Sequence, residues 1–318
     1  MPQATLQAGV AQIDITPPMG VEMSGYGPYE KRVATEVLDP LYARTLWLQA
    51  GEERLLILTL DLISIGRAVR DAVAHEISQQ CGLPPENILI AASHTHSGPA
   101  TQLMIGWGER DQPYLRRLEG LLVEAAVAAH ARLTPARLGA CRQRVQGIGV
   151  NREQPTLGPL DTAAQLMRID RADGTPLAVV YNIGAHGVAR YPYTRRISAD
   201  WPGLVAAGIE DALPPAVALF LQGCLGNINA HAMSFERRDV IVRQQVADMR
   251  TGDVAMRTCE QILPALRGLE TQAEVALGAV WKEISLPCVR PDPAALTRTI
   301  EENLAAAMRL SLADLRPL

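Results

Sequence analysis

Residues 87–99 read NILIAASHTHSGP, and this stretch carries the strongest indication of the fold. Its first half is an apolar run as long as a strand, and its second half has two histidines one residue apart. Similar apolar runs occur at 54–61, 177–186 and 216–223. Their almost continuous hydrophobicity is typical of strands covered on both faces. We therefore predict an α/β fold with a mixed or largely parallel sheet flanked by helices.

Amphipathic stretches between and after these runs predict the helices that cover the sheet. Apolar residues recur at helical spacing over 66–81 and over 112–133. The second stretch has Pro113 near its start, a position where proline is favoured. Further helices are expected over 253–266 and 294–312, and the last of these has an apolar face that needs a partner.

The composition indicates a soluble protein that binds a small molecule. The 318 residues are 48% hydrophobic, which is enough to bury a sizeable core. The net charge of −4 provides no basic field that would attract nucleic acid. The five cysteines are far apart in sequence and are interpreted as free thiols.

The organisation of the chain favours a single domain. We find neither an internal repeat nor a linker, and expect one catalytic domain over 1–290 and a helical segment, 291–318, of the same or a truncated domain. No apolar run reaches the roughly 18 residues of a membrane-spanning helix. We therefore expect a cytoplasmic location without stable membrane insertion, and an oligomer is compatible with these features.

Polar side chains follow each of the four predicted strands. They are Asp61 after the first, His94 and His96 after the second, His186 after the third, and Gln222, Asn227 and Asn229 after the fourth. Ligands of open α/β sheets bind at this edge. His94 and His96 point to the same side if their strand stays extended, and His186 is the natural third ligand. The sequence thus predicts a divalent metal site, with zinc as the expected ion.

Other polar residues have more than one interpretation. Arg152 could bind a carboxylate, a phosphate or a polar head group, or lie on the surface. Asp200, at a predicted helix start, could cap that helix, bind the metal or orient a histidine. His231 could line the pocket or lie in a solvated loop. His75 and His130 fall within predicted helices and are assigned to packing or surface.

Several short motifs follow one another along the chain. They are AGVA at 8–11, DITPP at 14–18, SGY at 24–26, DL at 61–62, SHTHSGP at 93–99, NR at 151–152, HG at 186–187 and QGCLGN at 222–227. This series resembles the N-terminal catalytic domain of neutral/alkaline (non-lysosomal) ceramidases and their bacterial homologues. The resemblance covers residues 8 to about 290, and SHTHSGP is its most specific element.

The resemblance implies a hydrolase of linear amide or ester bonds that uses one zinc ion. His94 and His186 match the zinc-ligand positions of the family, and His96 matches a position that contacts the substrate or supports the ligands. Arg152 resembles the arginine that helps to bind substrate, and we assign Gln222 and Asn227 to substrate binding as well.

Asn229 aligns with the catalytic serine of the ceramidases. Because an amide cannot act as the nucleophile, we expect water activated by the metal to attack the substrate, with His96, Arg152 and Asn229 as the catalytic positions. The glutamate and tyrosine ligands of the family come from farther toward the C-terminus than the aligned region. Asp200, and after it Asp61 or Glu22, are candidates to replace them.

Two other functions stay open at this point. One is a degenerate, non-catalytic homologue that binds a ligand or another chain, because two metal ligands of the family have no counterpart in the aligned region. The other is a phosphoester hydrolase with two metal ions, because histidines and aspartates at strand ends near Arg152 also suit a phosphate.

Overall fold

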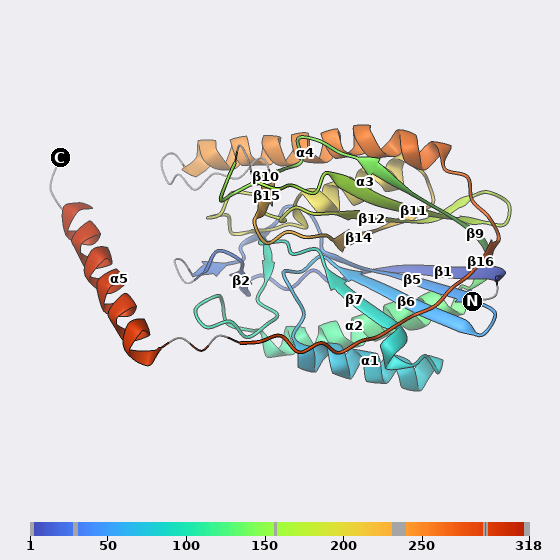
Figure 1. The fold of residues 1–318 in the computed structure, drawn as a ribbon, viewed down its shortest axis with the longest axis horizontal. Coiled ribbons are helices and arrows are strands. Elements are labelled where there is room, and N and C mark those ends of the chain that lie inside the picture. Colours follow the sequence, from blue (N-terminus) through green and yellow to red (C-terminus); the bar gives the residue numbers. More distant parts are fainter. Residues whose placement is uncertain are drawn as a thin grey trace. The chain divides into compact units, whose positions relative to one another are not determined.

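The computed structural model describes residues 3–27, 31–155, 158–230, 240–288, 290 and 292–314. The chain forms two compact units, Met1–Val280 and Trp281–Leu318. In the first unit, two layers of strands pack face to face, with α3 and α4 outside one layer and α1 and α2 outside the other (Figure 1). The second unit contains α5 (Pro293–Asp314).

The strands form a continuous ladder in the order β14-β12-β11-β9-β1-β5-β6-β7, and β16 pairs with β1. Their bounds are β1 Ala4–Asp14, β5 Tyr42–Ala50, β6 Glu53–Leu60, β7 Ile88–Ala92, β9 Thr134–Arg144, β11 Ala163–Arg171, β12 Pro176–Ile183, β14 Val217–Gln222 and β16 Glu274–Val275. Strands β1 and β9 pair only through Gln7–Pro135 and Ala8–Thr134. This short junction lets the ladder fold into two layers around a shared apolar core.

The predicted mixed sheet is confirmed. The four predicted strands are β6, β7, β12 and β14, and they form the two parallel pairs of the ladder, β6–β7 and β12–β14. Strands β6, β12 and β14 read as near-continuous apolar runs because one face meets the core between the layers and the other meets the helices. The edge strand β7 packs on the helix side through Ile88, and its Leu89 is 46% exposed. The remaining pairs along the ladder are antiparallel.

The helices follow the predicted pattern, with one difference in length. They are α1 Arg67–Cys81, α2 Gln112–Ala131, α3 Asp200–Ala212 and α4 Val240–Gly268. Helix α1 ends at Gly82, whose left-handed φ of 63° suits glycine, and α2 begins where Asp111 accepts a hydrogen bond from the Tyr114 amide. The helix predicted over 253–266 is the C-terminal half of α4. Among the described residues, no helix is long and apolar enough to cross a membrane.

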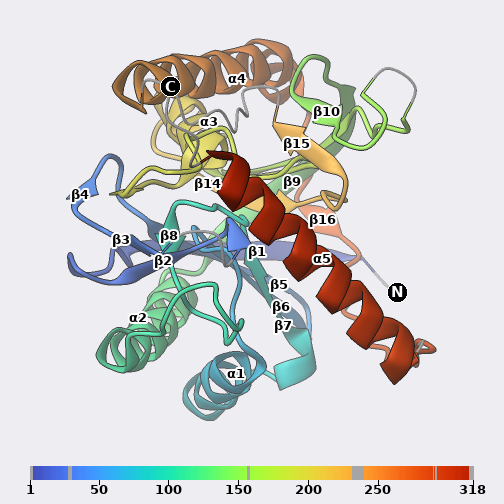
Figure 2. The same cartoon turned by 90° about the vertical axis from the view of Figure 1, so that its left-hand side faces the viewer.

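Shorter elements surround one end of the two layers. They are β2 Glu22–Ser24, β3 Arg32–Val33, β4 Glu36–Val37, β8 Gly98–Pro99, β10 Gly149–Asn151, β13 Arg196–Ile197 and β15 Ile228–Ala230. The 3-10 helix η2, Pro85–Asn87, directly precedes β7 at the other end of that strand. Strand β2 pairs with both β3 and β8, and β10 pairs with β15 (Figure 2). These pairs give the loops that follow the parallel strands a fixed backbone.

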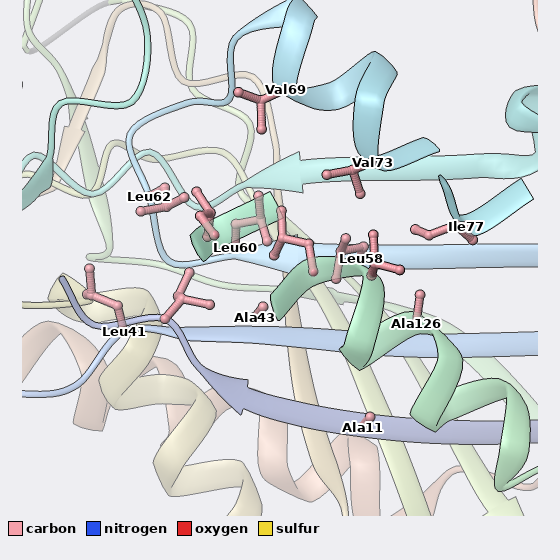
Figure 3. Close-up of a cluster of buried hydrophobic side chains, with 14 of the residues drawn as sticks. Ala11, Leu41, Ala43, Leu58, Leu60, Leu62, Val69, Val73, Ile77 and Ala126 are labelled. Atoms are coloured by element: carbon pink, nitrogen blue, oxygen red, sulfur yellow. The ribbon is translucent and has the colours of Figure 1, made fainter. Parts of the chain in front are cut away.

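Helix α1 covers its layer through a stripe of apolar side chains. Figure 3 shows Val69, Val73 and Ile77 of α1 directed toward Leu58 and Leu60 of β6, and all five are buried. Their spacing of four residues keeps them on one face of the helix. Full burial of such a side chain stabilises the fold by about 1.5–3 kcal/mol.

A buried ion pair links the end of β6 to β5 and α3. Asp61 accepts hydrogen bonds from Arg44 Nη1 at 2.7 Å and from the Tyr42 amide at 3.0 Å. Both charged side chains are 6% exposed, and Arg44 Nε also lies 3.5 Å from a Glu210 oxygen. Asp61, considered above as a replacement metal ligand, therefore serves as the counter-ion of Arg44.

Replacing Asp61 with alanine is expected to lower the free energy of unfolding by about 3–5 kcal/mol, because Arg44 then stays buried beside Glu210 alone. Urea unfolding followed by circular dichroism measures this. Asp71→Ala is the control, since Asp71 pairs with Arg67 and Arg70 at the surface, where loss of an ion pair costs about 1 kcal/mol or less. Equal losses in the two variants would contradict this prediction.

Candidate metal centre

The segment after β7 turns sharply at His94. Strand β7 ends at Ala92, the His94 amide donates to the Leu62 carbonyl at 2.9 Å, and His94 itself has a left-handed φ of 62°. The extended strand on which the sequence interpretation depended is therefore absent at His94, and the turn rather than a straight strand brings the two histidines together. A left-handed backbone is uncommon for residues other than glycine and is found mostly where the surrounding structure enforces it, as at functional sites.

This turn places His94 and His96 beside the loop that follows β12. Thr95 and Gly187 form a parallel bridge, and the His96 amide donates to the Gly187 carbonyl at 3.0 Å. His186 directly precedes Gly187, so its side chain starts one residue away from this contact. The two histidine loops, 94–96 and 186–187, are thereby joined through their backbones.

The three imidazoles converge on one point. Ring centroids lie 4.8 Å apart for His94 and His96, 5.0 Å for His94 and His186, and 5.6 Å for His96 and His186. One nitrogen from each ring can be chosen so that all three lie within 4.8 Å of one another. Within the part of the chain that the structure describes, this is the one group of histidine, cysteine and carboxylate side chains arranged to hold a metal ion.

Hydrogen bonds orient two of the three rings. His94 Nδ1 lies 2.7 Å from the Ile63 carbonyl, and His186 Nδ1 lies 3.0 Å from the Ile228 carbonyl. A carbonyl only accepts, so each Nδ1 carries the proton and each Nε2 keeps a free lone pair. Both ring nitrogens of His96 are buried and have no hydrogen-bond partner among the described residues. Buried polar atoms without a partner are costly, and a bound ion would satisfy one of the two nitrogens.

Burial keeps all three imidazoles neutral. It lowers the pKa of His96 well below 6.5, and the charges of His94, His186 and Arg32 act in the same direction. The Gly25 carbonyl opposes this shift but is not in hydrogen-bonding geometry. Burial also lowers the pKa of His94 and of His186, against the effect of their carbonyl partners. Neutral imidazole is the form that binds a metal.

Asp200 lies outside this group of ligands. Its side chain is fully buried at the first residue of α3, with a backbone φ of 58°. The carboxylate accepts hydrogen bonds from the amides of Ala189, Arg190 and Trp201, and burial raises its pKa. These three bonds fix the loop that follows His186 through backbone amides and not through a histidine ring.

Asn229 lies on β15, which pairs with β10, and Arg152 directly follows β10. The Arg152 amide donates to the Asn227 carbonyl at 2.8 Å, its side chain is exposed, and its charge contributes to the lowered pKa of His186. Asn229 pairs with Val150 between β15 and β10, and its Oδ1 is buried without a partner among the described residues. The structure thus brings Arg152 and Asn229 to the loops around the centre.

Gln222 holds the ends of β12 and β14 together. Its Nε2 donates to the carbonyls of Ile183 at 3.2 Å, Ala185 at 3.1 Å and Gly223 at 3.3 Å. These bonds occupy its donor group, and Oε1 is buried without a partner among the described residues. Asn227, the other residue assigned to substrate binding, is half-buried and contributes its carbonyl to Arg152.

The remaining candidates lie away from the centre or outside the described residues. Glu22 pairs with Lys31 at 2.6 Å. His75 is exposed on α1, and the His130 ring stacks on Trp47 with centroids 4.3 Å apart, in agreement with their assignment to packing or surface. His231 lies outside the residues that the structure describes.

Sequence reasoning gave no role to three residues beside His96. The Tyr26 ring meets the His96 ring edge-on, with centroids 5.1 Å apart. Arg32 donates to the His96 carbonyl at 2.9 Å and to the Ser24 carbonyl at 2.7 Å. Gly25 lies directly against the His96 side chain. The SGY motif at 24–26 marked two of them, but nothing in the sequence relates this motif to the histidines.

The fold and the histidine centre can now be compared with known proteins. The family described as "Neutral/alkaline non-lysosomal ceramidase, N-terminal" matches residues 6–255. The chain belongs to this family. The motifs of the neutral/alkaline ceramidases quoted above, from AGVA at 8–11 to QGCLGN at 222–227, all lie within the matched residues.

Individual relatives of the ceramidase family agree with this match. The neutral ceramidase of Mycobacterium tuberculosis is 27% identical over 208 residues, covering 58% of this chain and 32% of the relative. The crystal structure of neutral ceramidase from Pseudomonas aeruginosa gives a TM-score of 0.72 at 20% identity, over 82% of this chain and 44% of that chain. A ceramidase complexed with C2 gives a TM-score of 0.71 at 20% identity, with the same coverage. The chain spans less than half the length of each of these relatives.

The metal-free protein is expected to lose stability as the pH falls below about 6.5. Each histidine of the centre has a lower pKa in the folded chain than 6.5, so the unfolded chain binds more protons in this range, and the free energy of unfolding falls with pH. Urea unfolding in a chelator between about pH 7.5 and 5 measures this. The same series on His96→Gln removes the group with the largest shift and should give a shallower dependence, whereas an unchanged dependence would contradict the prediction.

Proposed function

We propose that this protein is a zinc-dependent hydrolase of amide or ester bonds whose catalytic domain spans residues 1–290. The observation that carries the proposal is the group of three neutral histidines with nitrogens within 4.8 Å of one another, in a chain of the ceramidase family. Relatives named as ceramidases make a linear amide the first substrate class to test. The chain covers less than half of those relatives, so its activity and substrate are to be measured on this chain itself.

The donor set fits a zinc ion. Zinc prefers nitrogen and sulfur ligands, and catalytic sites use three protein ligands with one open position. His94 and His186 would bind through Nε2, because the Ile63 and Ile228 carbonyls hold each Nδ1. His96 would supply the third nitrogen. When bound, zinc polarises a substrate carbonyl and lowers the pKa of a water molecule, which makes that water a nucleophile.

The residues of the chain itself would bind and orient the substrate. The exposed guanidinium of Arg152 can donate hydrogen bonds to a substrate oxygen beside His186. Asn229 has a buried amide oxygen without a partner among the described residues, so its side chain can pair with a substrate amide. Water must supply the attacking oxygen, because Asn229 stands where the ceramidases carry a serine.

The geometry favours one ion over two. The described residues contain a single group of side chains that could hold a metal ion. A second ion would need Asp61 and Asp200 as ligands, but Asp61 pairs with Arg44, and Asp200 accepts hydrogen bonds from backbone amides. One zinc ion per chain with amidase or esterase activity agrees with the proposed hydrolase. Two ions would favour the phosphoester hydrolase, and no ion would favour a ligand-binding homologue without catalysis.

Metal content tests the site directly. Elemental mass spectrometry should find close to one zinc per chain in the wild-type protein after zinc dialysis, and His94→Ala and His186→Ala should lose it, because each removes a ligand. His75→Ala is the matched control, since His75 is exposed on α1, and it should retain zinc. No zinc in the wild-type protein, or full zinc in both ligand variants, would overturn the proposed site.

Activity tests the role of Arg152. On any amide or ester that the protein hydrolyses, Arg152→Ala should lower kcat/KM by about 10-fold or more, the effect of losing a hydrogen bond from a charged group. Arg142→Ala is the control, because Arg142 is an exposed arginine on β9. Similar kcat/KM in both variants and the wild-type protein would remove Arg152 from the proposed site.

A further inference from the structure

The residues at the start of α3 hold both histidine loops of the centre. In the 94–96 loop, the Thr95 hydroxyl donates to the Ser198 carbonyl at 2.7 Å. On the other side, the indole Nε1 of Trp201 donates to the His186 carbonyl at 2.8 Å. The second of these bonds ends on a residue whose ring belongs to the centre itself.

Trp201 is anchored in the core beside the centre. Its side chain is fully buried, and its ring meets the Phe220 ring of β14 edge-on, with centroids 5.4 Å apart. Both rings belong to a cluster of buried apolar side chains from α3, α4, β12 and β14. The indole N–H is the one polar group of the ring, and it can only donate. Because the ring cannot turn within this packing, the core sets the direction of its hydrogen bond.

Three hydrogen bonds determine the position of His186, a residue that is 6% exposed. The Ile228 carbonyl accepts from its backbone amide and from its Nδ1, each at 3.0 Å. The bond from Trp201 holds the remaining backbone group, the carbonyl. That carbonyl belongs to the peptide group shared with Gly187, which forms the bridge to Thr95 of the other histidine loop. Trp201 therefore fixes the peptide group that lies between the His186 ring and the junction of the two loops.

We propose that Trp201 is a positioning residue of the metal centre, which acts through its indole N–H on the His186 carbonyl. Without this donor, a carbonyl of a buried residue loses its partner, and the 186–187 peptide group turns toward another donor. This rotation moves the His186 imidazole, and metal ligands tolerate little displacement. The inference rests on the proposed zinc site. It requires His186 as a ligand and is independent of the role of His96.

Trp201→Phe tests the inference, because it removes the donor and keeps an aromatic ring in the core. Its zinc affinity, measured by competition with a chromophoric chelator, should fall about 10-fold. This is the lower end of the loss seen when a group that orients a ligating histidine is removed, since Trp201 holds the backbone of the ligand and not its ring. The visible absorption bands of bound Co²⁺, which report ligand geometry, should shift in the same variant.

Trp47→Phe is the matched control. Trp47 is also fully buried, on β5, and its Nε1 has no hydrogen-bond partner among the described residues. The exchange removes the same ring atoms from the core but no bond to the centre. This variant should bind zinc within about twofold of the wild-type protein, even if urea unfolding shows that both variants lose stability. Equal losses of zinc affinity would mean that a smaller ring loosens the fold in general, and would overturn the role of the Trp201 N–H.

Trp201→benzothienylalanine separates the N–H from the size of the ring. This amino acid has sulfur in place of the indole N–H and nearly the same shape, so it removes the donor while the packing against Phe220 stays. It should bind zinc as weakly as Trp201→Phe, and it carries the test if Trp201→Phe does not fold by circular dichroism. Zinc affinity equal to that of the wild-type protein would overturn the inference.

The outcomes distinguish this inference from the proposed function. If the wild-type protein binds zinc and the folded Trp201 variants bind it equally tightly, with an unchanged Co²⁺ spectrum, the positioning role is overturned and the zinc site stands. A wild-type protein that binds no zinc would overturn the proposed function, and the positioning of His186 as a ligand with it.

Discussion

The parallel bridge between Thr95 and Gly187 is the contact on which the metal centre depends. It joins the loops that follow β7 and β12, and these strands belong to different layers of the fold. Each layer alone would present histidines at its own edge. Because the backbones meet at this bridge, His94 and His186 come within 5.0 Å of each other, measured between ring centroids. The left-handed turn at His94 is the local cost of this junction, and strain of this kind is tolerated where surrounding contacts fix the backbone.

Carboxylates near the centre have other partners, and this shapes its chemistry. Asp61 is the counter-ion of Arg44, Asp200 accepts three backbone amides, and neither belongs to the group of side chains that could hold a metal ion. What faces the common point is a set of neutral imidazole nitrogens, with the Arg152 charge near His186. Nitrogen donors favour zinc and other transition metals over magnesium or calcium, which prefer oxygen.

The sequence predicted those parts of the structure that can be recognised from a short stretch of consecutive residues. Strands β6, β7, β12 and β14 were recognisable because burial on both faces leaves an apolar run, whereas β1, β5, β9 and β11 mix polar and apolar residues and were missed. The three histidines were found because each follows a recognised strand. The Asp200 carboxylate bonds to amides about ten residues earlier in the chain, and Gly25 packs against His96 about 70 residues away. Contacts between residues so far apart produce no regular spacing of residue types, so a single sequence does not reveal them.

Under the proposed alignment of Asn229 with the serine of the ceramidases, metal binding and catalysis depend on different residues. A ceramidase with a serine at this position has an attacking oxygen of its own, whereas an amide can only bind and orient. The histidines and the residues that position them lie within the matched residues 6–255, which form less than half the length of the relatives. The three histidine nitrogens already converge in the loops described here. Hydrolysis needs in addition a water molecule placed between the ion and the substrate. In this proposal, a chain that keeps the geometry of its three histidines but does not position the water molecule still binds zinc. Metal content therefore reports on the histidines, and turnover reports on the residues that position water and substrate.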